Sequence, residues 1–111
     1  MDVTDRVDAA VPEDASGTIT VFVDHTTAGV VINEAEPRLR DDVRTFLGGV
    51  VSDDGWAHDR LDGNADSHLR ALLLGPSETI PIEDGALSLG RWQSVLLVEC
   101  DGPRERTVRV V

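Results

Sequence analysis

Lysine and tyrosine are absent from the sequence, and all ten of its basic residues are arginine. Acidic residues number 21, which leaves a formal net charge of −11. Nucleic-acid binding requires a basic patch that displaces counterions from phosphates, so this balance argues against a nucleic-acid partner. Anionic membrane surfaces are disfavoured for the same reason. The acidic residues are scattered along the chain, which indicates a solvated acidic surface.

The absence of lysine also bears on the source of the protein. Salt screens the mutual repulsion of acidic side chains, because the Debye length falls to roughly 3 Å at 1 M salt. An acidic surface without lysine is therefore typical of adaptation to a salty cytoplasm. We expect a halophilic protein, with an ordinary acidic mesophilic protein as the alternative.

Cysteine and long apolar runs are equally scarce. Cys100 is the single cysteine, so no disulfide can form within the chain, and we expect a cytoplasmic location. The longest apolar runs, such as ALLL and VLLV, are too short to span a membrane, and the acidic N-terminus is unlike a secretory signal. With 111 residues, of which 41% are hydrophobic, the chain fits one domain over residues 1–111.

Short periodic segments predict an α+β fold in which strands dominate. Apolar alternation and β-branched runs predict strands over residues 18–24, 26–33, 91–101 and 104–111, and a hairpin over residues 78–90 that turns at Asp84-Gly85. Helical spacing predicts helices over residues 4–11 and 36–49, the second ending at Gly48-Gly49, whereas residues 68–75 fit either a helix or a strand.

Two local features suggest special positions. Gly29 lies inside a predicted strand, which indicates a bulge or a close approach of another backbone. Residues 51–68 form a long polar segment, and a connection of this length in so small a domain is usually functional or mobile.

The three histidines, His25, His58 and His68, all lie in or beside predicted loops. Imidazole is the commonest protein ligand for zinc, and three protein ligands with one open position is the arrangement of catalytic zinc. Their spacing matches no compact metal motif, and a histidine is more often a plain polar surface residue. The residues by themselves therefore leave both interpretations open.

Other polar side chains also have both a functional and a structural interpretation. Arg104 and Arg106 could bind a phosphate, since a guanidinium pairs with two oxygens, or could pair with nearby carboxylates. Asn64 could cap a helix. Glu34 could be the exposed end of a strand, and Trp92 could be a core residue rather than part of a binding pocket.

Four segments occur in a fixed order along the chain: HTTAGVVINE, GNADSHLRALLLG, IPIEDGALSLGRWQ and ECDGPRERTVRV. In these segments the chain resembles the secondary thiamine-phosphate synthase family, from Thr4 to Val111. The resemblance implies a compact antiparallel β-sandwich or barrel-like sheet with a few short helices on one side, assembled as a homotrimer. It also implies a strand before residues 4–11, so either the sheet lacks this edge strand or the true start lies upstream.

The resemblance also implies a pocket that holds a divalent metal, with zinc as the expected ion. The residues it assigns to metal binding are His25, His58 and His68; to catalysis Glu34, Asp66 and Arg104; and to substrate binding Asn64, Trp92 and Gln93. The strand over residues 26–33 would then carry a metal ligand at one end and, at the other, a carboxylate for the pocket or for a neighbouring subunit.

The implied activity is the joining of two thiamine precursors with release of pyrophosphate. We expect this activity to be weak, because the chain lacks lysine and a Gly-rich phosphate loop. A metal-assisted hydrolase and a non-catalytic trimeric module that binds a metal or small anion are the alternatives. A further alternative is a structural protein whose three histidines have no common role.

Overall fold

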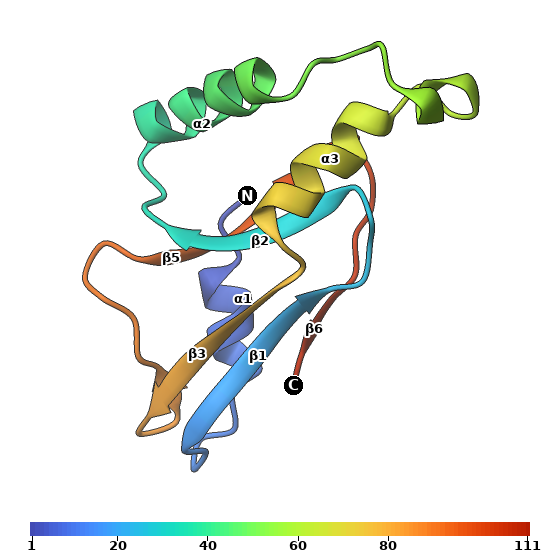
Figure 1. Cartoon of the computed structure of the whole chain (residues 1–111). Helices are drawn as coiled ribbons and strands as arrows, with labels where there is room; N and C mark the ends of the chain where they lie inside the picture. The colour runs from blue at the N-terminus through green and yellow to red at the C-terminus, as the bar shows by residue number, and fades with distance from the viewer.

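The computed structural model describes all of residues 1–111. Its elements are α1 (Thr4–Ala9), β1 (Gly17–Val23), β2 (Ala28–Asn33), α2 (Pro37–Val50), the 3-10 helix η1 (Ala57–Arg60), α3 (Ala65–Leu74), β3 (Ser77–Glu83), β4 (Ala86–Leu87), β5 (Ser94–Glu99) and β6 (Val108–Val110). They form an α+β fold with a curled antiparallel half-barrel sheet and a few short helices (Figure 1). The predicted fold class is confirmed.

The sheet consists of two antiparallel parts. One part has the strand order β4-β3-β1-β6, and the other is the β2–β5 pair. In the β2–β5 pair, Ala28 lies opposite Glu99 and Asn33 lies opposite Ser94. The backbone N–H of Val30 donates to the carbonyl of Gly75 at 3.1 Å, which joins β2 to the chain just before β3. The two parts therefore curl into one continuous surface.

The hydrophobic core lies between this curled sheet and α1. Alternate residues of β1 point inward, as the period of a strand requires. The core cluster contains Val3, Val7, Val11, Ile19, Val21, Val23, Ala28, Val30, Ile80, Ile82, Val95 and Leu97. Both parts of the sheet contribute to this cluster together with α1, so burial of α1 holds them together.

The first residues of the chain run beside β5. Asp2 forms an antiparallel bridge with Leu96, and the N–H of Val3 donates to the carbonyl of Val95 at 2.9 Å. The terminal amine of Met1 donates to the carbonyl of Leu97 at 2.8 Å. Residues 1–3 therefore follow the edge of β5, where an additional strand would pair.

Gly29 shows the close approach that the sequence indicated. A Cβ atom at this position would lie 2.7 Å from Cβ of Leu74 and 2.9 Å from the carbonyl oxygen of Gly75. Such distances are too short for carbon atoms in contact. Glycine therefore allows the end of α3 to pack directly on β2. The hairpin is also confirmed, with positive φ at Asp84 and Gly85.

The predicted helix over residues 36–49 is confirmed, since α2 spans Pro37–Val50 and ends one residue beyond Gly48-Gly49. A tertiary contact lies at its C-terminus. The Arg70 side chain donates to the carbonyls of Leu47 and Val51 at 3.0 and 2.8 Å, which ties the C-terminus of α2 to α3. Residues 68–75, for which the sequence left two options, form most of α3.

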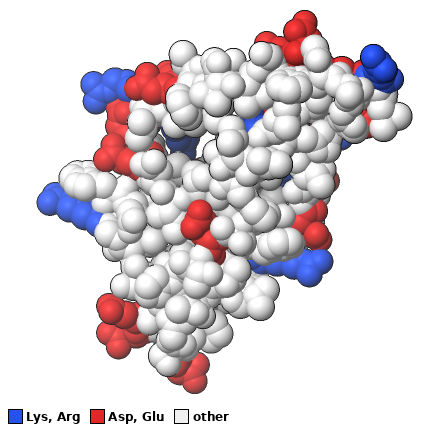
Figure 2. Space-filling model, viewed as in Figure 1, with Lys and Arg blue, Asp and Glu red and all other residues white.

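Acidic side chains are spread over the molecule. Figure 2 shows them at separate places on the visible face, with arginines mainly toward its edges. This agrees with the predicted scattered acidic surface. None of the helices combines the length and apolar character that crossing a membrane requires.

Candidate functional site

A polar pocket lies where three loops meet, namely β1–β2, η1–α3 and β5–β6. Its volume is about 670 Å³, and none of its ten lining residues is hydrophobic. The lining residues are Asp24, His25, Thr26, Thr27, Asp62, Asn64, His68, Asp101, Arg104 and Arg106. The structure thus brings together His25, His68, Asn64 and Arg104, four of the residues predicted for a site.

His25 is held by the backbone that leads into β6. Its Nε2 accepts the N–H of Thr107 at 2.9 Å. Because Nε2 accepts a hydrogen bond, the neutral ring carries its proton on Nδ1. The neighbouring Asp24 accepts from Arg109 of β6 at 2.9 Å. The first half of the β1–β2 loop is therefore fixed against β6, with the Nδ1–H of His25 left as a donor.

Arg106 fixes the second half of the β1–β2 loop. Its side chain is 7% exposed and forms two hydrogen bonds with the Glu99 carboxylate. It also donates to Oγ1 and the carbonyl of Thr27 at 2.8 and 3.2 Å. The hydrogen bonds from Arg106 lower the pKa of Glu99 below its ordinary value. Arg106 therefore ties the loop before β2 to the end of β5.

Asp101 organises the other side of the polar pocket. Its Oδ2 accepts from Nδ2 of Asn64 at 2.9 Å and from Nη2 of Arg104 at 3.0 Å, and Nε of Arg104 donates to its carbonyl at 2.7 Å. These contacts, the Asn64 hydrogen bond foremost, lower the pKa of Asp101. Oδ1 of Asn64 is buried without a partner. The remaining Nη1 of Arg104 makes no hydrogen bond, so it is available to a ligand.

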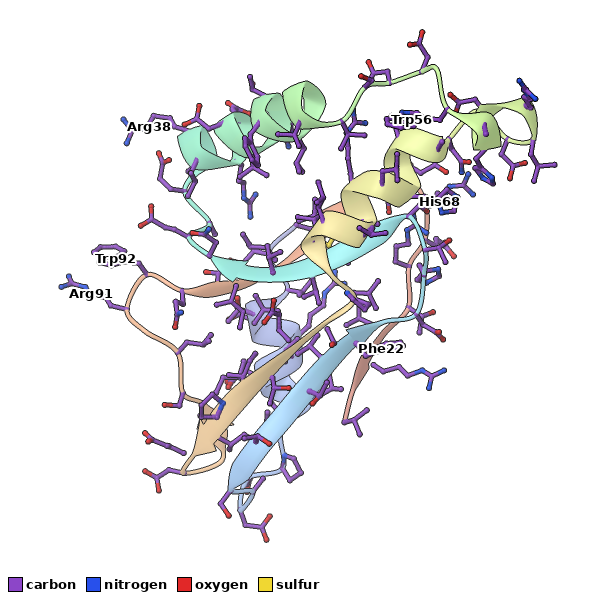
Figure 3. The ribbon with its side chains drawn as sticks, viewed as in Figure 1. Phe22, Arg38, Trp56, His68, Arg91 and Trp92 are labelled. Carbon is purple, nitrogen blue, oxygen red and sulfur yellow. The ribbon has the colours of Figure 1, made fainter.

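A second cavity of about 370 Å³ adjoins the polar pocket and shares His68 with it. Its walls are largely apolar, and its lining residues are Trp56, Ala57, His58, Ala65, His68 and Leu69. The rings of His58 and His68 meet edge to face, with centroids 4.8 Å apart and an interplanar angle of 88°. Figure 3 shows Trp56 and His68 on the same side of the molecule, around the start of α3.

The predicted three-histidine metal centre is not formed. The chain contains no group of three or more His, Cys, Asp or Glu side chains arranged so that they could hold a metal ion. The Nε2 of His25 already accepts a backbone N–H, so its lone pair is not directed at a metal. His58 faces the second cavity and not the polar pocket. The prediction of metal binding is therefore corrected: the histidines lie near one another but do not form a ligand set.

Several other predicted site residues lie away from the polar pocket. Asp66 pairs with Arg70 at 2.6 Å, so its carboxylate belongs to the contact between α3 and the C-terminus of α2. Glu34 follows the opposite end of β2, about 20 Å along the strand from Ala28 at 3.3 Å per residue. Trp92 and Gln93 lie in the β4–β5 loop, and Figure 3 shows Trp92 on the opposite side of the view from His68.

Five lining residues are absent from the sequence predictions: Asp24, Thr26, Thr27, Asp62 and Asp101. The repeated threonine of HTTA and the aspartate of DGPR were visible signals, but neither indicates a pocket without its partner. Burial raises the pKa of the Cys100 thiol, which keeps the sulfur protonated.

The comparisons with known proteins identify the family. A family described as UPF0047 protein YjbQ-like matches residues 1–111. A UPF0047 protein of Archaeoglobus fulgidus is 48% identical over 99% of this chain and 87% of its own length. YugU of Bacillus subtilis, also a UPF0047 protein, is 35% identical over 96% of this chain and 83% of its own length.

Solved structures agree with this result. A hypothetical protein from Aeropyrum pernix is 45% identical and superposes with a TM-score of 0.95, covering 100% of this chain and 85% of its own. A YbjQ-like protein of unknown function from Sulfolobus solfataricus is 36% identical with a TM-score of 0.91, covering 99% of this chain and 83% of its own.

These matches overturn the resemblance inferred from the sequence. The family is one of unknown function, and neither its description nor those of the relatives names thiamine-phosphate synthesis. They also establish no halophilic origin, so the interpretation of the acidic surface as salt adaptation is set aside. What the segments from HTTAGVVINE to ECDGPRERTVRV identify is a different family. The chain belongs to the YjbQ-like UPF0047 family.

Proposed function

We propose that this protein is a binding module for a small molecule that bears an anionic group, and that the polar pocket is its binding site. The observation that carries the proposal is the set of hydrogen-bonding groups left unused there. Nη1 of Arg104 makes no hydrogen bond, Nδ1–H of His25 is free, and His68 makes no side-chain hydrogen bond within the chain. Donors of this kind suit phosphate or carboxylate oxygens.

Most carboxylates around the pocket are paired with arginines. Of the three aspartates in the lining, Asp24 pairs with Arg109 and Asp101 pairs with Arg104. Glu99, just outside, pairs with Arg106. These carboxylates are largely compensated by guanidinium groups, so they repel an incoming anion weakly. Asp62 is the remaining acidic group, 3.7 Å from Nε2 of His58.

The metal predicted from the sequence takes no part in the proposal. The side chains of one chain do not form a ligand set for zinc or another divalent ion. A metal-assisted hydrolysis therefore has no support in the arrangement of the three histidines. A cytoplasmic location remains part of the proposal, on the basis of the single cysteine.

We also propose that the chain assembles as a homotrimer. Exposed apolar side chains on α2 and α3 support assembly, since Phe46, Val50, Leu72 and Leu73 are 51–73% exposed. Leu47 is the single buried residue of α2. Apolar helix surfaces of this kind usually become buried between subunits. Light scattering after gel filtration should give three times the chain mass of 12.0 kDa; a monomer would refute the assembly.

Anion binding is tested by titrating the protein with inorganic phosphate and with sulfate in a calorimeter. We expect saturable binding that Arg104→Gln weakens about tenfold, because a hydrogen bond to a charged group contributes roughly 1.5–3 kcal/mol. The matched control is Arg38→Gln on α2, where the arginine also pairs with a carboxylate, that of Glu36, but lies 92% exposed outside the pocket. Absence of saturable binding, or equal effects of the two variants, would refute the proposal.

A further inference from the structure

The second cavity differs from the polar pocket in the chemistry of its walls. Four of its six lining residues are hydrophobic, whereas the polar pocket has no hydrophobic residue in its lining. The tryptophan and two imidazoles there bring three ring systems around one space. Flat rings bind well in such surroundings, because ring faces and edges attract each other beyond the burial of apolar area.

His68 joins the two cavities. It lies one turn into α3 from the N-terminal residue Ala65, and it lines both spaces. Its ring meets His58 edge to face on the side of the second cavity. A ligand that touches His68 from the polar pocket therefore needs only a short extension to reach Trp56 and Leu69.

His58, in the wall of the second cavity, also has an unsatisfied polar atom. Nε2 of His58 is buried and has no hydrogen-bond partner, since the carboxylate of Asp62 lies 3.7 Å away. A buried polar atom without a partner costs free energy, roughly 1–3 kcal/mol in proteins.

We propose that the ligand has two parts: an anionic group bound in the polar pocket and a flat ring bound in the second cavity between Trp56 and the His58–His68 pair. This inference rests on the proposed function, since it takes the anion site as given and names the class of molecule that the site selects. Phosphate- and carboxylate-bearing aromatic molecules are that class. The volume of about 370 Å³ suits one ring with small substituents.

The protein provides its own reporter for this proposal. Its two tryptophans are Trp56, at the second cavity, and Trp92, which is 64% exposed in the β4–β5 loop. Trp92→Phe leaves Trp56 as the only tryptophan, so fluorescence then reports on the second cavity alone. The titrants are methyl phosphate and phenyl phosphate, which share the anionic group and differ in the ring.

We expect phenyl phosphate to bind about tenfold more tightly than methyl phosphate, the factor that burial of a ring face provides. Phenyl phosphate should also change the Trp56 fluorescence, and methyl phosphate should not. Two variants, whose affinities are measured by calorimetry, should abolish the tenfold difference while keeping the affinity for methyl phosphate. Trp56→Leu removes the ring wall, and Ala57→Leu fills the cavity from its edge.

The outcomes separate this inference from the proposed function. Equal affinities for the two phosphates would overturn the inference and leave the anion site in place. A tenfold difference that survives both variants would also overturn it, because the ring would bind elsewhere. Failure of both phosphates to bind would refute the anion site itself, and the inference with it. Circular dichroism of each variant checks that it is folded.

Discussion

The two ends of the β2–β5 pair are both polar, but only one of them is built into a pocket. At the end where Ala28 pairs with Glu99, Arg106 is 7% exposed and bonds both Glu99 and the loop before β2. At the end where Asn33 pairs with Ser94, Trp92 is 64% exposed and carries only Arg91 over its ring, at 4.8 Å. The difference shows that polar residues at a strand end form a site only where a third segment covers them.

The largest expected effect comes from removing the central guanidinium of the pocket end. Arg106→Met should lower the free energy of unfolding by about 3 kcal/mol, the low end for losing one partner of a buried ion pair, because the Glu99 side chain is still 29% exposed. Urea unfolding followed by circular dichroism measures the loss. The matched control is Arg104→Met, whose side chain is 57% exposed and whose loss should cost under about 1 kcal/mol. Equal losses of stability in Arg106→Met and Arg104→Met would contradict the distinction between a buried and an exposed ion pair.

A glycine-to-alanine substitution should also have different effects on stability at the two ends of the β2–β5 pair. Gly29→Ala should destabilise by about 2 kcal/mol, because the new Cβ would meet Cβ of Leu74 and a backbone oxygen that cannot move independently. Gly90→Ala, at the far end, meets the flexible Gln93 side chain at 3.2 Å, so we expect a loss below about 0.5 kcal/mol. Thermal unfolding of the two variants measures both losses of stability. A larger loss for Gly90→Ala would show that the far end is the more tightly packed one.

Acid should lower the stability of the fold by protonating Glu99 and Asp101 at the pocket end. The pKa values of both groups lie below their ordinary values of 4.5 and 3.8, so the folded state favours their charged forms. The resulting stabilisation is fully present above those values and is lost as the pH falls through them toward the lower folded-state values. The double variant Glu99→Gln and Asp101→Asn should flatten the decline in urea midpoint between about pH 5 and pH 2. If the urea midpoint of the double variant declines as steeply as that of the unaltered protein, groups other than Glu99 and Asp101 cause the acid sensitivity.

The smallest effect is expected from the far end. Trp92→Ala should change the free energy of unfolding by less than about 1 kcal/mol, because an exposed cation–π contact contributes about that much. Phosphate affinity should stay unchanged, since Trp92 does not line the polar pocket. A loss of phosphate affinity in Trp92→Ala or Gln93→Ala would mean that the far end of a neighbouring subunit completes the pocket, which would revise the comparison.

Much of the fold was predictable because it follows from local patterns. The alternation in β1, the β-branched run of β2 and the Asp84-Gly85 turn each specify their structure within a few residues. The contact of Arg70 with the carbonyls of Leu47 and Val51 at the end of α2 was not predictable, because it joins two different helices. The family resemblance was also misassigned, since shared segments identify common ancestry and leave the chemistry open.

The candidate site was predictable only in part. The sequence predicts His25, His68, Asn64 and Arg104, which line the polar pocket. It also predicts five residues that do not line it, namely Glu34, His58, Asp66, Trp92 and Gln93. Asp66 illustrates the reason. Its place beside Asn64 and His68 in the sequence suggested a shared role, but on α3 its side chain meets Arg70 instead.

By itself, the sequence determined the acidic surface, the α+β class, the strand and hairpin positions and the small polar segments that flank β2. The tertiary structure decided which of those segments meet. His25 receives the N–H of Thr107 from 82 residues away, and Arg106 reaches Thr27 across 79 residues. Contacts at such separations depend on how the strands pair and curl, which no local pattern encodes. The same long-range contacts direct Nε2 of His25 to the backbone, so the three histidines of one chain do not form the ligand set that the sequence suggested.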